Sequence, residues 1–137
     1  MPSRRRSRQR ALQILFSWDA RRQPVEEAIS AYYDSLVSEE HPERDPFVAE
    51  LVRGTVAHAA EIDGQISKHA EHWRMERMPA VDRNLARIAV YELLYVAEID
   101  DPVAISEAVE LAKQLSTEDS PRFLNGLLAR IAEYATR

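Results

Sequence analysis

The chain has 137 residues, of which 45% are hydrophobic and 30% are charged, and its formal net charge is −5. This length is typical of one globular domain that needs no disulfides to hold its core. The chain has no cysteine, which excludes a disulfide scaffold, a thiol nucleophile and a cysteine-ligated metal, and fits the reducing cytoplasm. No apolar run is long enough to span a bilayer, so no membrane contact is expected.

Positive charge is concentrated at the start of the chain. Five arginines precede the first acidic residue: Arg4, Arg5, Arg6, Arg8 and Arg10. Residues 19–137 carry 13 basic and 23 acidic side chains, a balance of −10. Behind the arginines, Leu12, Leu15 and Phe16 recur at helical spacing, which predicts a first helix from about residue 5 to residue 21.

Several of these arginines lie three or four residues apart and share helix faces, as Arg4 and Arg8 do. Like charges stacked in this way disfavour a helix unless an anion neutralises them. The cluster therefore predicts a surface for a polyanion at one end of an acidic body. The alternative is a solvated N-terminal tail with no binding role.

Five further helices are predicted, and most of them follow a proline at the first helical position. They begin near Pro24, Pro46, Pro79, Pro102 and Ser120, and the one that starts at Pro46 is expected to continue to about Trp73. Residues 38–45 read as a polar loop. No run of alternating apolar residues predicts a strand, so the chain reads as all-α.

The segment 81–97 is apolar over most of its circumference, which predicts a central helix. We expect one domain in which two halves, about 1–73 and 74–137, pack around a shared core. All three glycines fall inside predicted helices, where close approach of a neighbouring element would compensate for their cost.

No catalytic pattern is found, so the chain is not expected to be an enzyme or to hold a cofactor. His58 with Glu61, and His69 with His72, share helix faces but lack the pattern of a zinc protease, so no metal site is expected. Glu107 and Glu110 lie one turn apart and are expected to face solvent. Glu92 lies at the edge of the central apolar stripe, which predicts a structural ion pair with an arginine.

The junction at residues 116–126 has features of an RNA contact. Ser120 is a predicted cap of the last helix, whose first turn offers free N–H groups to an anion. Arg122 adds a cation, and Phe123 is either a face on which an unpaired base stacks or a core residue. Asp119 suits hydrogen bonds from base amino groups or the orientation of an arginine.

Three segments together resemble the NusB family of bacterial transcription antitermination factors. They are RRRSRQRALQILFSWD (4–19), VDRNLARIAVYELLY (81–95) and VAISEAVELAKQLSTEDSPRFLNGLL (103–128). The resemblance implies a fold of six or seven helices in two small bundles packed across one another. It also implies that the protein binds the single-stranded boxA element of nascent RNA together with NusE, and helps to assemble the antitermination complex on RNA polymerase.

The resemblance also implies site residues. The RNA-binding positions of the family fall on Arg4, Arg5, Arg8, Arg87, Asp119, Ser120, Arg122 and Phe123. The surface that faces NusE is expected to include Phe16 and Asp82. Monomer and homodimer both remain open.

Our main hypothesis is that the first arginines and the start of the last helix form a joint cradle for one RNA strand. The first alternative is an accessory RNA-binding domain of a ribosomal RNA methyltransferase, although 137 residues leave no room for the methyltransferase domain itself. The second is a protein-interaction module whose arginines are incidental.

Overall fold

The structure of the protein is a computed structural model that describes residues 3–36, 44–71 and 73–135, and every regular element in these ranges is a helix. The elements are α1 (Arg4–Arg21), α2 (Val25–Asp34), α3 (Pro46–Ala57), α4 (Ala59–His69), the short 3₁₀ helix η1 (Met75–Arg77), α5 (Ala80–Tyr95), α6 (Asp101–Leu115) and α7 (Ser120–Ala135). The prediction of an all-α fold is confirmed. The loop expected at 38–45 lies outside the described residues except for its last two positions.

Local sequence signals set most helix starts. The Ser3 side chain accepts a hydrogen bond from the backbone N–H of Arg6 at 3.1 Å and caps α1. Asp45 caps α3 in the same way by accepting from the N–H of Phe47, with Pro46 at the first helical position. These bonds satisfy N–H groups that have no partner inside the helix, which is why such residues start helices.

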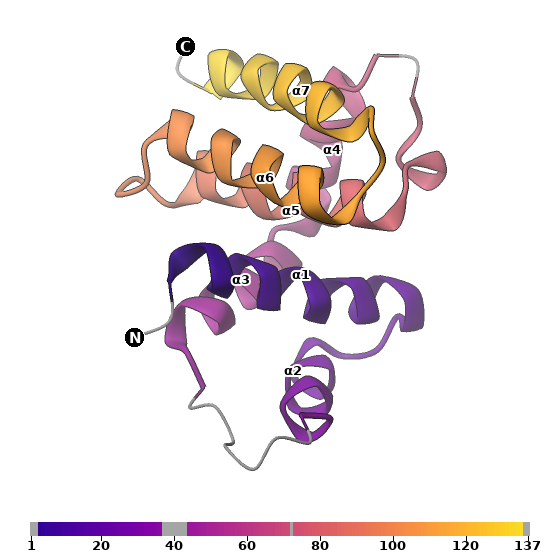
Figure 1. Cartoon of the computed structure of the whole chain (residues 1–137), viewed down its shortest axis with the longest axis vertical. Coiled ribbons are helices and arrows are strands. Elements are labelled where there is room, and N and C mark those ends of the chain that lie inside the picture. The colour runs from indigo at the N-terminus through magenta and orange to yellow at the C-terminus, as the bar shows by residue number, and fades with distance from the viewer. Residues whose placement is uncertain (1–2, 37–43, 72, 136–137) are drawn as a thin grey trace.

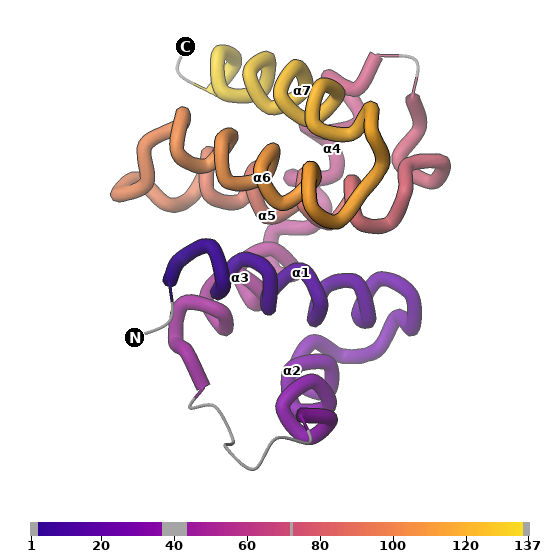
Figure 2. The backbone as a smooth tube through the Cα atoms, in the orientation of Figure 1, coloured from indigo at the N-terminus to yellow at the C-terminus, as the bar shows by residue number. Residues whose placement is uncertain are grey.

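Helix α5 is central, as predicted. Its residues 84–92 are buried without interruption, and the helix packs against α1, α3, α4, α6 and α7. Figure 1 shows α1, α2 and α3 on one side of this core and α4, α6 and α7 on the other. In Figure 2, α7 runs back over α6 in the opposite direction.

The single long helix expected from Pro46 to about Trp73 is wrong. The structure breaks it at His58, whose φ of −107° and ψ of 19° are not helical, so that α3 ends at Ala57 and α4 starts at Ala59. The break lets α3 pack with α1 while α4 packs with α5 and α7.

The glycine expectation holds best at Gly54. A Cβ atom on Gly54 would lie 2.2 Å from Cζ of Tyr91, so the ring of Tyr91 occupies the space that a side chain would need. No such neighbour lies within 4 Å at Gly64. Tertiary packing therefore accounts for the first of these glycines but not for the second.

Candidate nucleic-acid interface

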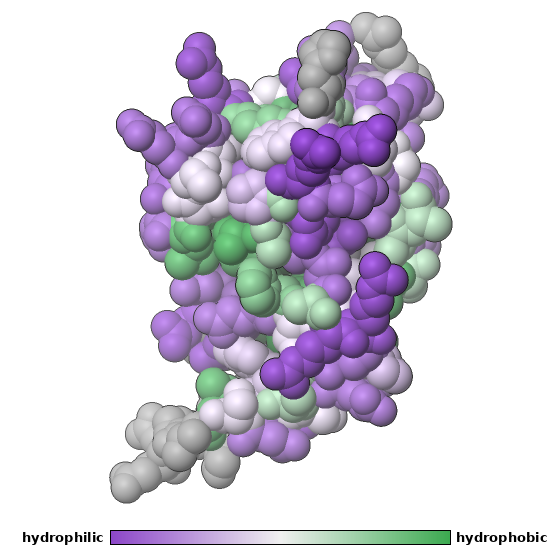
Figure 3. All heavy atoms as spheres, turned by 90° about the vertical axis from the view of Figure 1, so that its right-hand side faces the viewer, coloured by the Kyte–Doolittle hydropathy of each residue, from purple (hydrophilic) through white to green (hydrophobic). Residues whose placement is uncertain are grey.

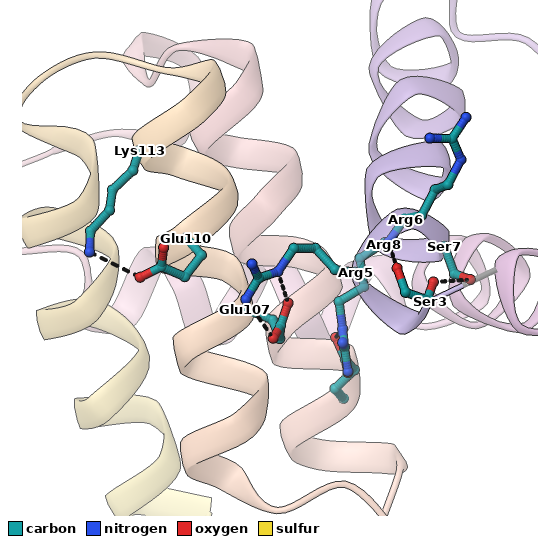
Figure 4. A network of polar contacts seen from close by, with 9 residues as sticks. Ser3, Arg5, Arg6, Ser7, Arg8, Glu107, Glu110 and Lys113 are labelled. Carbon is teal, nitrogen blue, oxygen red and sulfur yellow. Dashed lines mark hydrogen bonds and ion pairs between the residues drawn. The ribbon is translucent and has the colours of Figure 1, made fainter.

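Hydrogen bonds of Ser3 and Ser7 fix the first turn of α1. Besides the cap from Ser3, the Ser7 hydroxyl donates to the Ser3 carbonyl at 3.1 Å and also to the carboxylate of Asp45 (Figure 4 shows the contacts within α1). Asp45 is the same residue that caps α3. The start of α1 is therefore held against the start of α3, and the arginines between the serines have a defined orientation.

Arg8 does not face solvent. Its side chain is 5% exposed and donates from Nη2 to Oε1 of Glu92 at 2.6 Å, and from Nε to Oε2 at 3.0 Å. Burial raises the pKa of Glu92, and the bonds from Arg8 oppose this shift. The ion pair predicted for Glu92 is confirmed, and the structure gives Arg8 an internal partner where we expected an RNA phosphate.

Arg5 reaches α6 in the other half of the molecule. Its Nε donates to Oε2 of Glu107 at 2.8 Å and its Nη2 donates to Oε1 at 3.1 Å, as Figure 4 shows. The hydrogen bond from Arg5 lowers the pKa of Glu107 despite its partial burial. Glu107 is 19% exposed, so the expectation that it simply faces solvent is wrong, whereas Glu110 pairs with Lys113 on the surface.

Arg4, Arg5 and Arg6 are all exposed, but Arg4 and Arg6 do not share the ion pairing of Arg5. The guanidinium carbon of Arg4 lies 3.8 Å from the centroid of the Phe47 ring, which orients the charge without neutralising it. Figure 4 shows the side chain of Arg6 extended away from the rest of the network. Within the described residues, neither arginine has a carboxylate in ion-pair range. Arg6 was not among the expected site residues, although its place in the arginine run was the signal for it.

Beside these arginines lies an open groove of about 870 Å³. Arg4, Arg5 and Arg8 line it together with four acidic residues of α3, α6 and the α5–α6 connection: Glu50, Glu98, Asp100 and Glu107. Ser3 and the apolar side chains of Val96, Ile99 and Val103 complete the lining. The groove itself is therefore not a cationic channel. The positive charge that no carboxylate pairs with lies at Arg4, on the edge of the groove, and at Arg6, which does not line it.

Arg87, the predicted RNA arginine of the central helix, is held by two acids. It donates to both oxygens of Asp63 at 2.8 and 3.0 Å and lies 3.2 Å from Oδ2 of Asp19. Its side chain is 8% exposed. Its guanidinium also lies 5.5 Å from the ring centroid of Trp18.

Asp82 and Ser120 face each other inside the protein. The Ser120 hydroxyl donates to Oδ2 of Asp82 at 2.7 Å, and the Ser116 hydroxyl donates to Oδ1 of the same carboxylate. Asp82 is fully buried and Ser120 is 1% exposed. These two residues therefore join the first turn of α5 to the first turn of α7, whereas we had expected them to face NusE and RNA respectively.

The other residues of that junction lie at the surface. Asp119 and Arg122 are exposed, and Phe123 is half-buried. The ring of Phe123 meets the ring of Trp73 edge to face, with centroids 4.4 Å apart and planes at 72°. Trp73 was not predicted as a site residue, because 50 residues separate it from Phe123 and only packing brings the two rings together.

The predicted RNA residues fall into separate groups. In Figures 1 and 2, α1 and α6 begin on the left, whereas α7 begins on the right. Arg5 contacts Glu107 in the middle of α6, and from there about 14 Å of helix leads to Ser116. The arginines of α1 and the exposed residues at the start of α7 thus form two separate surface patches along α6. They do not form one compact cradle.

Phe16, the expected partner residue, is 44% exposed on α1. In the part of the chain that the structure describes, no group of three histidine, aspartate or glutamate side chains is placed to hold a metal ion, and no helix is both long and apolar enough to cross a membrane. His72, one of the histidines considered for a metal, lies outside the described residues.

Comparison with known proteins gives the same family throughout. The family model described as the NusB family matches residues 5–133. The chain is 66% identical to the transcription antitermination protein NusB of Solibacter usitatus, over 93% of this chain and 87% of that one. It is 59% identical to the protein of the same name from Salinispora arenicola, over the full length of both.

Solved structures of NusB proteins have the same fold as this chain. NusB of T. maritima superposes with a TM-score of 0.84 at 35% identity, over 96% of this chain and 92% of that one. A structure of the antitermination factors NusB and NusE in complex with dsRNA superposes with a TM-score of 0.81 at 27% identity, over 96% of each chain. The family-model match over residues 5–133 and the identity to these relatives show that this chain belongs to the NusB family.

Proposed function

We propose that this protein is a transcription antitermination factor that binds the single-stranded boxA element of nascent RNA together with NusE and helps to assemble the antitermination complex on RNA polymerase. This function would operate in the cytoplasm and needs no catalytic group. The observation that carries the proposal is the pair of exposed guanidinium groups of Arg4 and Arg6, which form no ion pair within the described residues, on a helix turn fixed by Ser3 and Ser7.

In this proposal the arginines differ in role. Arg4 and Arg6 bind phosphates, Arg5 exchanges the Glu107 carboxylate for a phosphate, and Arg8 holds the turn in place through Glu92. Exposed Phe16 provides an apolar contact for NusE. At the start of α7, Asp119 and Arg122 contact RNA that continues along α6. Phe123, packed against Trp73, offers a ring to an unpaired base there.

We expect an Arg4→Ala/Arg6→Ala variant to bind a boxA RNA more weakly, because it loses two phosphate contacts. Its affinity should also depend less on salt, because fewer counterions are released on binding. The slope of log K against log salt should fall in magnitude by about 1.4, which is about 0.7 for each contact with a single strand. The measurement is a fluorescence anisotropy titration at several salt concentrations, with and without NusE. Arg53→Ala is the matched control, because Arg53 is an exposed arginine on α3 that already pairs with Glu26. Unchanged slopes for the α1 variant would contradict the proposal.

Glu107 competes with RNA for Arg5, so Glu107→Gln should bind boxA RNA more tightly. The pair is exposed on the arginine side, and surface pairs of this kind are weak, so we expect an increase in affinity of about two- to fivefold. Glu26→Gln is the control, because Glu26 forms the same two-bond contact with Arg53 away from α1. Equal or lower affinity in the Glu107 variant would show that Arg5 does not contact RNA.

The alternative of a methyltransferase accessory domain has less support. The Salinispora arenicola relative, which matches along its whole length, is named a transcription antitermination protein. For the third hypothesis, a protein-interaction module, the titration above is decisive: binding of NusE with no contribution from RNA would favour it.

A further inference from the structure

Three adjoining hollows of about 350, 430 and 430 Å³ form a continuous groove away from the first turn of α1. The first and second share Asp19, Arg22 and Arg87, and the second and third share Ser67, Met75 and Glu76. Figure 1 places the C-terminal end of α1 and η1, which border the groove, on the same side of the molecule. Figure 3 looks at that side and shows strongly hydrophilic residues spread across it, with less polar surface between them.

Each end of this groove contains one tryptophan and one exposed arginine, although the other lining residues differ, with Asp19 and Arg87 in the first hollow and Glu76 in the last. Trp18 and Arg22 line the first hollow, and Trp73 and Arg74 line the last. Both tryptophans are half-buried and both arginines are exposed. Within the described residues, neither Arg22 nor Arg74 has an acid in ion-pair range. Each end therefore offers an indole ring beside an unpaired guanidinium group, and these are the two groups that bind a base and its phosphate.

The backbone at Arg22 supports a binding role. Arg22 follows the last turn of α1 with a φ of 52° and a ψ of 36°, the left-handed conformation in which a helix usually ends on glycine. An arginine in that conformation is strained by roughly 1–2 kcal/mol relative to its favoured regions. It is the only residue other than glycine with positive φ in the described ranges. At the end of α1, the chain therefore has the cationic side chain of Arg22 at a backbone conformation that favours glycine.

The middle of the groove is rigid and nearly neutral. Arg83 donates to Asp19 at 2.8 Å and to the carbonyls of Met75 and Met78 at 3.0 Å, while Arg87 is held by Asp63. Asp19 and Asp63 are thereby engaged by arginines, and Glu76 supplies one further negative charge. The floor of the groove is fixed by this network, so the unpaired charge lies at its two ends.

We propose that this groove is a second binding site for unpaired RNA, with one base stacked at Trp18 and another at Trp73, and with phosphates on Arg22 and Arg74. The inference rests on the proposed function. It extends the RNA path beyond α1, and it joins that path to Phe123 through the Trp73–Phe123 contact. Asp63 lines the middle hollow and Ala70, just past the end of α4, lines the last, and about 10 Å of chain along the helix axis separates these two residues.

The chain has only two tryptophans, so fluorescence reports each end separately. Trp18→Phe leaves Trp73 as the sole reporter, and Trp73→Phe leaves Trp18. With boxA RNA of about 12 nucleotides we expect quenching in both variants, with the same midpoint that anisotropy gives for RNA binding. Because Trp73 also contacts Phe123, Trp18 is the reporter that separates the two proposals: if RNA binds by anisotropy while Trp18 does not respond, the groove proposal is wrong and the proposed function stands. If no RNA binds with or without NusE, both are wrong.

Arginine variants provide the second test. Arg22→Gly relieves the positive φ, so weaker RNA binding cannot be ascribed to unfolding, and Arg74→Ala removes the charge at the other end. Each should reduce the salt slope by about 0.7, and Arg53→Ala should not. Unchanged slopes in both variants would overturn the proposal. A tryptophan response to NusE alone, with none to RNA, would overturn it by assigning the groove to the protein partner.

Discussion

Replacing Arg8 with alanine is expected to lower the free energy of unfolding by about 3–5 kcal/mol, because it leaves the buried carboxylate of Glu92 without its partner. Glu92 is 1% exposed, so its carboxylate is shielded from solvent and depends on the guanidinium of Arg8. Urea denaturation monitored by circular dichroism measures the change. Arg5→Ala is the matched control, because Arg5 makes the same kind of two-bond contact at the surface, and we expect its stability to change little.

A double variant separates structure from binding at this position. Arg8→Met/Glu92→Leu replaces the buried pair by apolar side chains and is expected to recover most of the lost stability, since such replacements are often neutral or stabilising. If Arg8 only positions the first turn of α1, the double variant binds boxA RNA nearly as the unmodified protein does. A folded double variant that has lost RNA binding would show that Arg8 contacts RNA directly.

Asp82→Ala is expected to have the second largest effect. The carboxylate accepts from the hydroxyls of half-buried Ser116 and buried Ser120, and loss of a buried acceptor of this kind costs about 1–3 kcal/mol. Asp82 also lies in the first turn of α5, where the helix dipole favours an acid. We expect the substitution to release the start of α7 from α5. Thermal and urea unfolding measure the resulting loss of stability.

The control for Asp82 is Asp119→Ala, because Asp119 is an exposed acid next to Ser120, and such surface changes usually lie within about 0.5 kcal/mol. Asp82→Asn keeps one acceptor and should lie between the other two. If Asp82→Ala kept full stability but lost NusE binding, Asp82 would be a direct partner contact, and the structural role given to it here would be wrong.

Much of the fold could be predicted because the signals are local. Asp45 and Pro46 mark the start of α3, because Asp45 accepts from a helix N–H and Pro46 has none to satisfy. Ser120, predicted to cap the last helix, is instead its first residue, and its hydroxyl donates to Asp82. The central place of α5 followed from its apolar circumference. The break at His58 was missed because no proline or glycine marks it, and only the packing of α3 and α4 against different neighbours explains it.

The candidate site could be predicted only in its composition. That an arginine cluster opens the chain, and that Glu92 needs a cationic partner, can be read from residue type and helical spacing. Which arginine pairs with Glu92 cannot, because Arg8 lies 84 positions away, and Arg5 and Glu107 are 102 positions apart. The sequence by itself determined an all-helical chain with a concentrated positive charge, since both depend on neighbours along the chain. Only the tertiary structure decided which of those charges meet buried acids and which reach solvent, because ion pairing depends on distances that packing alone sets.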